Sequence, residues 1–372
     1  MSLANDIERT SRLDLAFANF LSQRTTFQGA DKKQFATILA LLSHQQRQGH
    51  TCIEISKDDK DLLLGSGFAC LAAKDGIQPY PLIIEDNRLY LQRYWCYEDR
   101  LTKQISQLAQ KNYDTNKLDT LLDRYFPSSS KETDWQREAA SLACQQAFTI
   151  ITGGPGTGKT TTVCKILALL QELVDKPLLI ALAAPTGKAA MRLQEAIVHN
   201  LALLGCPQTI NECIPQSAAT LHRLLGANPP SPYFKHHADN PLVYDLIVVD
   251  EASMVDLALM SKLVDALKPG ARLILLGDKD QLSSVESGAV LADLIAGLPH
   301  NTVELTQSYR FDEGIKKLAD AVNRQDHDTA WALLSARDGM NGLIDPMRLM
   351  PYIMEQRQEY LHLVKAGADF TQ

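Results

Sequence analysis

The chain has 372 residues, which at about 150 residues per domain is enough for two or three domains. Hydrophobic residues make up 45% and charged residues 22%, a balance that excludes wholesale disorder. Lysine and arginine number 37, against 44 for aspartate and glutamate. The resulting net charge of −7 argues against nucleic-acid binding that is driven by the overall charge of the protein. A local basic groove is compatible with this composition.

Cysteine spacing and targeting signals bear on the compartment. The seven cysteines form no C-x-x-C pair, which argues against a disulfide framework. Residues 1–20 carry charges where a signal peptide needs an apolar core. The longest apolar run, Leu178–Ala184, is far shorter than the ~20 residues of a membrane-spanning helix. We therefore expect a soluble, cytoplasmic protein with reduced thiols.

Residues 1–126 are expected to form a small mixed α+β domain. A β-hairpin is expected where Leu82–Ile84 and Leu89–Leu91 flank an Asp86-Asn87 turn. Two amphipathic helical stretches follow, at 94–111 and 118–126. No spacing in this region suggests catalytic chemistry, so we interpret it as an interaction module that docks a partner.

A polar break at 127–130 predicts a domain boundary. Beyond it, short apolar runs alternate with helical stretches, which predicts an α/β fold with a parallel sheet covered on both faces. The expected strands are Phe148–Thr152, Leu178–Ala184, Leu246–Asp250, Leu273–Gly277 and Val303–Leu305. The expected helices are 134–146, 158–171, 188–204, 256–268 and 288–297. We expect this domain to span 127–300, with a small loop or hairpin inserted at 227–243.

A complete phosphate-binding pattern, G-x-x-x-x-G-K-[ST], lies between the first expected strand and the helix after it. Its residues are Gly153, Gly154, Pro155, Gly156, Thr157, Gly158, Lys159 and Thr160. Glycines let backbone N–H groups curl around phosphate oxygens, and the helix N-terminus adds its dipole. We expect Lys159 to reach the β and γ phosphates and Thr160 to offer its hydroxyl to Mg²⁺. The alternative, a glycine-rich structural turn, is disfavoured because every motif position is filled.

Two adjacent acids, Asp250 and Glu251, follow another apolar run. Open α/β sheets bind their ligands at the carboxyl ends of the strands. We expect Asp250 to hold Mg²⁺ through its water shell and Glu251 to accept the proton of the attacking water. A solvated acid pair at a strand end is the alternative.

Two further side chains lie near the ends of later strands. The amide of Gln281 can bond both the γ-phosphate and a neighbouring polar group, and it could thereby report the nucleotide state. Arg310 is a candidate finger for the charge that develops on the transferred phosphoryl group. An arginine near a loop is usually solvated, and it is the order of these segments after the phosphate-binding loop that supports the assignment.

In chain order, six segments resemble the motifs of superfamily 1 helicases. They are GGPGTGKTT (153–161), APTGKAA (184–190), TLHRLLG (220–226), VVDEAS (248–253), LGDKDQL (276–282) and QSYRF (307–311). More narrowly, they resemble the RecD family, the α subunits of the exodeoxyribonuclease V (RecBCD) helicase–nuclease, as does RLYLQRYWCYEDR (88–100). The resemblance covers essentially the whole chain. It implies a RecA-like P-loop ATPase domain, with 301–372 as the beginning of a second RecA-like domain.

The resemblance also implies site roles. It implies that Gln136 reads adenine, that Thr161 belongs to the nucleotide-binding loop, and that Tyr309 stacks on the base beside Arg310. The residues implied to contact DNA are Pro185, Thr186, Lys188, Thr220 and His222. For His222, packing on a short helix is the alternative. The insertion at 227–243 is compatible with a projection that touches DNA or with a plain surface loop.

Two functions remain open at this point. One is an ATP- and Mg²⁺-dependent DNA helicase, in which ATP hydrolysis depends on single-stranded DNA; the other is an ATP-binding assembly subunit that does not move DNA. The intact hydrolytic set favours the first. The resemblance implies 5′ to 3′ polarity, RecB and RecC-like partners, action on single-stranded and duplex-end DNA, and a role in double-strand break repair and homologous recombination.

The end of the sequence carries fewer motifs than the family resemblance would require. Helical segments are expected at 314–323, 327–335 and 350–365, but no motif that would close a second RecA-like domain over ATP follows. We therefore expect a C-terminally truncated chain that binds nucleotide better than it turns nucleotide over. No cluster of carboxylates and lysine suggests a nuclease site, which is expected on a partner subunit.

Overall fold

The computed structural model describes residues 10–335 except 74–78, 114, 116, 128–133, 232, 282–287, 289 and 307–312, together with Pro351, Met354, Arg357, Gln358 and His362. The chain divides into two compact units, Met1–Gln307 and Ser308–Gln372.

The first unit begins with two helices packed on each other, α2 (Arg12–Ser22) and α3 (Gly29–Arg47). A four-stranded sheet follows, with the order β1-β4-β3-β2. Its elements are β1 (Cys52–Glu54), α4 (Lys57–Gly65), β2 (Ala69–Leu71), β3 (Leu82–Glu85) and β4 (Arg88–Leu91). The expected hairpin is confirmed, because β3 and β4 pair antiparallel around a turn in which Asp86 has φ 52°.

The next two helices cover a second sheet. Helix α5 (Gln92–Ala109) starts directly after β4 and packs against α12 (Leu257–Asp265). Its Leu101 and Ile105 are buried in one cluster with Phe148 and Ile150. Helix α6 (Leu118–Tyr125) contributes Leu118 and Leu122 to the cluster on the opposite face of the same sheet. The sequence-based boundary at 126 therefore separates α5 and α6 from the sheet that they cover.

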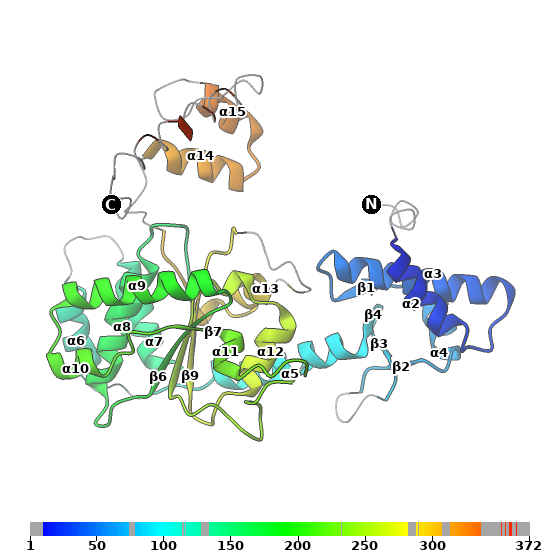
Figure 1. Cartoon of the computed structure of the whole chain (residues 1–372), viewed down its shortest axis with the longest axis horizontal. Helices are drawn as coiled ribbons and strands as arrows, with labels where there is room; N and C mark the ends of the chain where they lie inside the picture. Colours follow the sequence, from blue (N-terminus) through cyan, green and yellow to red (C-terminus); the bar gives the residue numbers. More distant parts are fainter. Residues whose placement is uncertain are drawn as a thin grey trace. The chain divides into compact units, whose positions relative to one another are not determined.

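This second sheet has six strands in the order β10-β5-β9-β8-β6-β7, and every pairing is parallel. Its strands are β5 (Phe148–Thr152), β6 (Ile180–Ala184), β7 (Ala219–Thr220), β8 (Leu246–Val249), β9 (Arg272–Gly277) and β10 (Thr302–Glu304). The remaining helices of this unit are α7 (Trp135–Gln145), α8 (Lys159–Leu173), α9 (Gly187–Leu204), α10 (Gln208–Glu212), α11 (Leu221–Leu225) and α13 (Val290–Gly297). The predicted α/β fold is confirmed (Figure 1).

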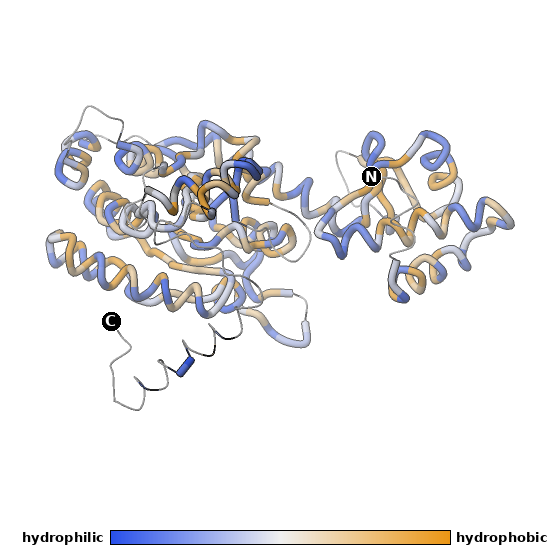
Figure 2. Tube along the Cα trace, turned by 90° about the horizontal axis from the view of Figure 1, so that it is seen from above, coloured by the Kyte–Doolittle hydropathy of each residue, from blue (hydrophilic) through white to orange (hydrophobic). Residues whose placement is uncertain are grey.

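The sheet is buried on both faces, and the tube of Figure 2 alternates hydrophobic and hydrophilic colours along the helices around it. All five residues of β5 and all six of β9 are buried. Continuous burial is typical of a central parallel strand and explains the unbroken apolar runs in the sequence. Because β9 lies between β5 and β8, the carboxyl ends of these three strands meet at one edge.

The second compact unit contains α14 (Glu313–Asn323) and α15 (His327–Ser335), which pack on each other. The helices expected at 314–323 and 327–335 are thus present, whereas most of 350–365 lies outside the described residues. β10 pairs with β5, so the expected boundary at 300 precedes the last strand of the first unit. The assignment of 301–372 to a second RecA-like domain stays a prediction. Within the described residues no helix combines the length and apolar character needed to cross a membrane.

Candidate nucleotide-binding site

The loop between β5 and α8 has the backbone that the glycine-rich pattern requires. Gly156 and Gly158 have φ of 77° and 82°, in the left-handed region that other residues rarely adopt. Gly153 is enclosed, because a Cβ there would lie 2.7 Å from the carbonyl oxygen of Leu305. The sequence thus forms a tight turn that ends where α8 begins, at Lys159.

The Lys159 side chain folds over this loop. Its Nζ donates to the carbonyl oxygens of Gly153, at 2.5 Å, and Gly154, at 3.1 Å. The Thr157 hydroxyl donates to the same Gly154 oxygen at 2.9 Å. The lysine cation is therefore centred on the loop whose amides are suited to phosphate oxygens.

Acidic residues lie at the ends of two neighbouring strands. After β8, the backbone N–H of Glu251 donates to Asp250 Oδ1 at 2.9 Å. Glu251 has φ 52°, a left-handed conformation that is uncommon for a residue with a side chain and that clusters at functional sites. After β9, the buried Asp278 accepts a hydrogen bond from the backbone N–H of Asp280 at 3.0 Å.

The charges at these strand ends act on one another. Burial lowers the pKa of the Lys159 ammonium, and the carboxylates of Asp278, Asp250 and Glu251 oppose that shift. Burial raises the pKa of Asp250, which the Lys159 cation counteracts. Three carboxylates therefore lie within electrostatic range of the loop lysine, an arrangement that sequence spacing alone does not show.

Asp278 is the site residue that the sequence reasoning missed. The signal was present, because Asp278 directly follows the apolar run of β9, the position that Asp250 holds after β8. Gln281, which was singled out instead, donates its backbone N–H to Asp278 O at 3.3 Å, and its side chain is exposed. Its role as a reporter of nucleotide state stays a prediction.

Helix α7 brings a polar side chain to the loop. Asp134 caps this helix by accepting hydrogen bonds from the backbone N–H groups of Gln136 and Arg137. Gln136 Nε2 then donates to the Thr157 carbonyl oxygen in a long hydrogen bond of 3.5 Å. Gln136 is thus next to the phosphate loop. Tyr309 and Arg310 lie outside the described residues, so their expected roles stay predictions.

The residues expected to contact DNA gather at one sheet edge. β6 and β7 pair so that Ala184 is opposite Thr220, which places Pro185 and Thr186 beside Thr220. Both threonines cap helices: the Thr186 hydroxyl accepts from Ala189 N–H and the Thr220 hydroxyl from Arg223 N–H. Capping alone explains a threonine at either position. The side chains of Lys188 and His222 are exposed.

The insertion at 227–243 folds back on itself, with isolated antiparallel bridges between Ala227 and Phe234 and between His237 and Asn240. Its Lys235 N–H donates to the Gly226 carbonyl oxygen at 3.0 Å. The Phe234 ring meets the His222 ring edge-on, with 5.6 Å between centroids. His222 thus has a packing partner as well as an exposed face.

A magnesium ion would find oxygen ligands but no closed protein cage. Among the described residues, no group of three or more histidine, cysteine, aspartate or glutamate side chains could hold a metal ion. Mg²⁺ in nucleotide sites is commonly bound by one or two protein oxygens, phosphates and waters. The Thr160 hydroxyl, in the first turn of α8, and the Asp250 carboxylate, directly after β8, are the kinds of oxygen ligand that such a site uses.

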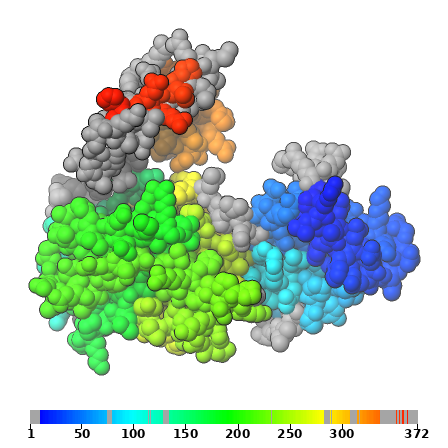
Figure 3. All heavy atoms as spheres, viewed as in Figure 1, coloured from blue at the N-terminus to red at the C-terminus, as the bar shows by residue number. Residues whose placement is uncertain are grey.

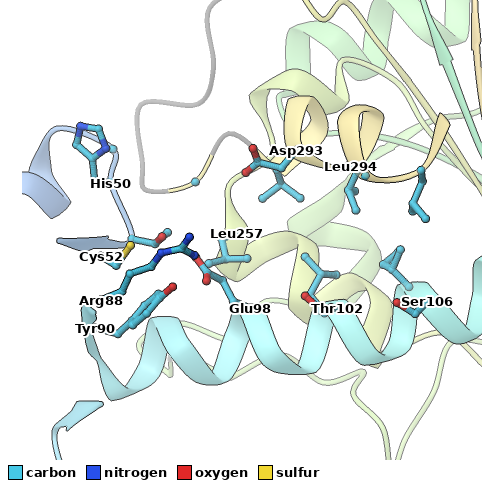
Figure 4. A pocket seen from close by; sticks show the side chains of 18 residues that line it. His50, Cys52, Arg88, Tyr90, Glu98, Thr102, Ser106, Leu257, Asp293 and Leu294 are labelled. Carbon is cyan, nitrogen blue, oxygen red and sulfur yellow. The ribbon is translucent and has the colours of Figure 1, made fainter. Parts of the chain in front are cut away.

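A separate cavity of about 700 Å³ lies between the N-terminal sheet and α13. Figure 4 shows Arg88 and Tyr90 of β4 and Glu98 of α5 on one side of the cavity, with Asp293 of α13 across from them. Burial raises the pKa of Glu98, and the Asp293 carboxylate adds to the rise. No phosphate-loop residue is among the described residues that line this cavity, so it is distinct from the candidate nucleotide site.

The parallel sheet, the phosphate loop after β5 and the acids after β8 and β9 define a RecA-like P-loop protein, a class that binds nucleotides. Residues 136–287 match the family model of an AAA domain. Residues 8–73 match the model of the N-terminal domain of RecBCD enzyme subunit RecD. The chain belongs to the RecD family.

The relatives agree with this assignment. RecBCD enzyme subunit RecD of Mycolicibacterium smegmatis is 47% identical over 72% of this chain and 49% of its own length. RecBCD enzyme subunit RecD of Haemophilus influenzae is 38% identical over 76% of this chain and 51% of its own. The ATP-dependent RecD2 DNA helicase of Deinococcus radiodurans is 32% identical over 74% and 38%. The chain thus spans about half the length of the RecD subunits that it matches.

Proposed function

We propose that this chain is an ATP-dependent DNA helicase subunit of a RecBCD-type helicase–nuclease, with single-stranded-DNA-dependent ATP hydrolysis. The observation that carries the proposal is the placement of Asp250 and Glu251 directly after β8 and of Asp278 directly after the neighbouring β9, within electrostatic range of Lys159. Hydrolysis needs one carboxylate for Mg²⁺ and a second as general base, and this set supplies both. The RecD relatives, one of them named an ATP-dependent DNA helicase, support DNA as the second substrate.

In the proposed mechanism, the phosphates of ATP lie against the backbone N–H groups of residues 153–158. Lys159 turns from the Gly153 and Gly154 carbonyl oxygens to the β and γ phosphates, which are the stronger acceptors. Thr160 and Asp250 would hold Mg²⁺, which would neutralise phosphate charge when bound. Gln136 reads the adenine, beside Thr157.

Hydrolysis needs a base at the γ-phosphate end of the site. Glu251 is proposed to accept the proton of the attacking water. Its backbone is in the left-handed region, so the chain leaves the extended conformation of β8 at this residue. Gln281 and Arg310 are proposed to bond the γ-phosphate, with Arg310 stabilising the charge of the transition state and Tyr309 stacking on the base.

DNA is proposed to bind at the β6–β7 edge through Pro185, Thr186, Lys188, Thr220 and His222. The overall charge of −7 makes a local contact of this kind the only electrostatic option. By family resemblance we propose 5′ to 3′ movement, assembly with RecB and RecC-like subunits through the N-terminal region, action at DNA ends in the cytoplasm, and a nuclease site on a partner.

The alternative is an ATP-binding assembly subunit that does not move DNA. The test is ATP hydrolysis by the purified protein with and without oligo(dT), alone and assembled with RecB and RecC-like partners. The helicase proposal predicts that oligo(dT) raises the rate at least about tenfold, a factor worth 1.4 kcal/mol of barrier. ATP binding with no hydrolysis in either state, with or without oligo(dT), would support the assembly subunit instead.

A further inference from the structure

Helix α9 touches both expected DNA segments and the phosphate-loop helix. At its start, Thr186 caps the helix and Lys188 lies in its first turn. In its middle, Gln194 Oε1 accepts from the Ala218 backbone N–H at 3.4 Å, two residues before Thr220. Figure 1 shows α9 as the long green helix next to α8, and Figure 3 shows this green part of the chain at the surface of the same view.

Farther along, α9 is tied to the phosphate loop by a side-chain hydrogen bond. The Thr161 hydroxyl donates to Asn200 Oδ1 at 2.8 Å. Thr161 lies in the first turn of α8, two residues after Lys159. The bond therefore joins the helix that carries the DNA segment to the turn that carries the phosphate-binding lysine.

The Asn200 side chain is held in one orientation. Its Nδ2 donates to the Ala196 carbonyl oxygen of the same helix at 2.7 Å, so its Oδ1 is left to face Thr161. The inner face of α9 is buried at Leu193, Ile197 and Leu201, in the cluster that holds Val163 and Leu167 of α8. α9 is thus packed along α8 as well as bonded to it.

Because an α-helix rises 1.5 Å per residue, Lys188 and Asn200 lie roughly 18 Å apart along one stiff element. A shift of the first turn of α8 on nucleotide binding would pull on Asn200 and move the helix as a body. We propose that α9 couples the nucleotide site to the DNA-contact residues, with Asn200 as the positioning residue that ties α9 to Thr161. The inference rests on the proposed function.

Coupling between two ligands is reciprocal and is measured as a ratio of dissociation constants. We would measure the Kd of fluorescent oligo(dT) with and without a non-hydrolysable ATP analogue. In the wild type the analogue is expected to change this Kd by at least about fivefold, the lower end of common allosteric couplings. In Asn200→Ala the change should fall to about twofold or less, while the Kd of either ligand measured alone stays within threefold of the wild-type value.

Matched variants separate the bond from a general packing defect. Thr161→Val removes the hydroxyl and should reduce the ratio of oligo(dT) Kd values, without and with the analogue, as much as Asn200→Ala does. Thr161→Ser keeps a hydroxyl and should retain the wild-type ratio. The double variant Thr161→Val/Asn200→Ala should reduce the ratio no further than either single variant. His199→Ala, an exposed neighbour on α9, is the control for the helix. Wild-type coupling retained in both Asn200→Ala and Thr161→Val would overturn the inference.

The same measurement distinguishes the inference from the function on which it rests. A wild-type protein that binds both ligands without any change in the oligo(dT) Kd overturns the coupling role of α9 and leaves the proposed function standing. A wild-type protein that binds neither ligand overturns the proposed function and the inference together.

Discussion

Arg100 of α5 and Asp265 of α12 form an ion pair, with 2.6 Å between Arg100 Nη1 and Asp265 Oδ2. Gln104, one turn along α5, donates to the other carboxylate oxygen at 2.7 Å. Asp265 therefore receives both side chains and fixes α5 across α12. A helix that the sequence assigned to the docking domain thus packs on a helix of the P-loop domain.

This relationship predicts where the N-terminal region can be cut. A fragment that begins at Gln92 keeps α5 and should unfold cooperatively and bind ATP, whereas one that begins at 127 leaves Phe148 and Ile150 without the cover of Leu101 and Ile105. Losing two buried aliphatic contacts of this size costs on the order of 4–6 kcal/mol. Circular dichroism on heating would compare them. A fragment from 127 that melts within a few degrees of the fragment from 92 would contradict the prediction.

Glu251 is predicted to act in hydrolysis rather than in binding. Glu251→Gln keeps the shape and removes the base, so kcat should fall by about 10²–10⁴-fold while ATP affinity stays nearly constant. Stopped assays of phosphate release and titration with a fluorescent ATP analogue measure the two quantities. A twofold fall in kcat would remove Glu251 from the role of base, and Asp250 or Asp278 would become the candidate.

The buried Asp14 predicts a pH-dependent stability of the N-terminal region. Burial opposes its ionisation, but hydrogen bonds from Arg47, Ser43 and Ser11 outweigh burial and hold its pKa well below the usual range. Since the folded-state pKa is the lower one, the stabilisation is present above pH ~4 and is lost as the pH falls toward the folded-state value.

Asp14→Asn should therefore lower the free energy of unfolding by about 1–3 kcal/mol at pH 7, by less near pH 3, and by progressively less as the pH falls further toward the folded-state pKa of Asp14. Urea unfolding at the two pH values measures the difference. Glu54→Gln, at an exposed acid of β1, is the control and should change stability little at either pH. Equal destabilisation by Asp14→Asn at both pH values would show that the ionised carboxylate is not what matters.

Lys188 is predicted to contact the phosphate backbone of single-stranded DNA. Lys188→Ala should weaken oligo(dT) binding and lower the slope of log Kd against log salt by about 0.7, the value for one phosphate contact on a single strand. Lys176→Ala, at an exposed lysine before the opposite, amino end of β6, should leave the slope unchanged. The same slope in Lys188→Ala and wild type would place the DNA elsewhere.

Much of the P-loop domain could be predicted because its signals are local. The run Phe148–Thr152 matches strand β5 at both ends, and the other expected strands differ from the observed ones by one or two residues at one or both ends. The short strands β1, β2 and β7 were missed, because two or three residues are too few to show an alternation of apolar and polar side chains.

Other features depend on the assembled fold. The position of β9 between β5 and β8, which brings Asp278 to Lys159, follows from strand order and not from spacing. Helix α2 was also missed, because its buried side combines Ala18 and Leu21 with the charged Asp14 while Leu13 and Phe20 are exposed, which obscures the amphipathic pattern. The Arg47 and Ser43 partners that make this burial tolerable come from another helix.

The central claim is that the Lys159 ammonium binds the phosphates of ATP in a protein whose ATP hydrolysis depends on single-stranded DNA. The most direct measurement is the rate of ATP hydrolysis with saturating oligo(dT) in wild type and Lys159→Ala, with Lys176→Ala as the matched control. Loss of the only cation in the phosphate loop should lower kcat by at least about 10²-fold, as expected for a group that stabilises transition-state charge, and Lys176→Ala should match wild type. A Lys159→Ala rate within threefold of the wild-type rate would contradict the account.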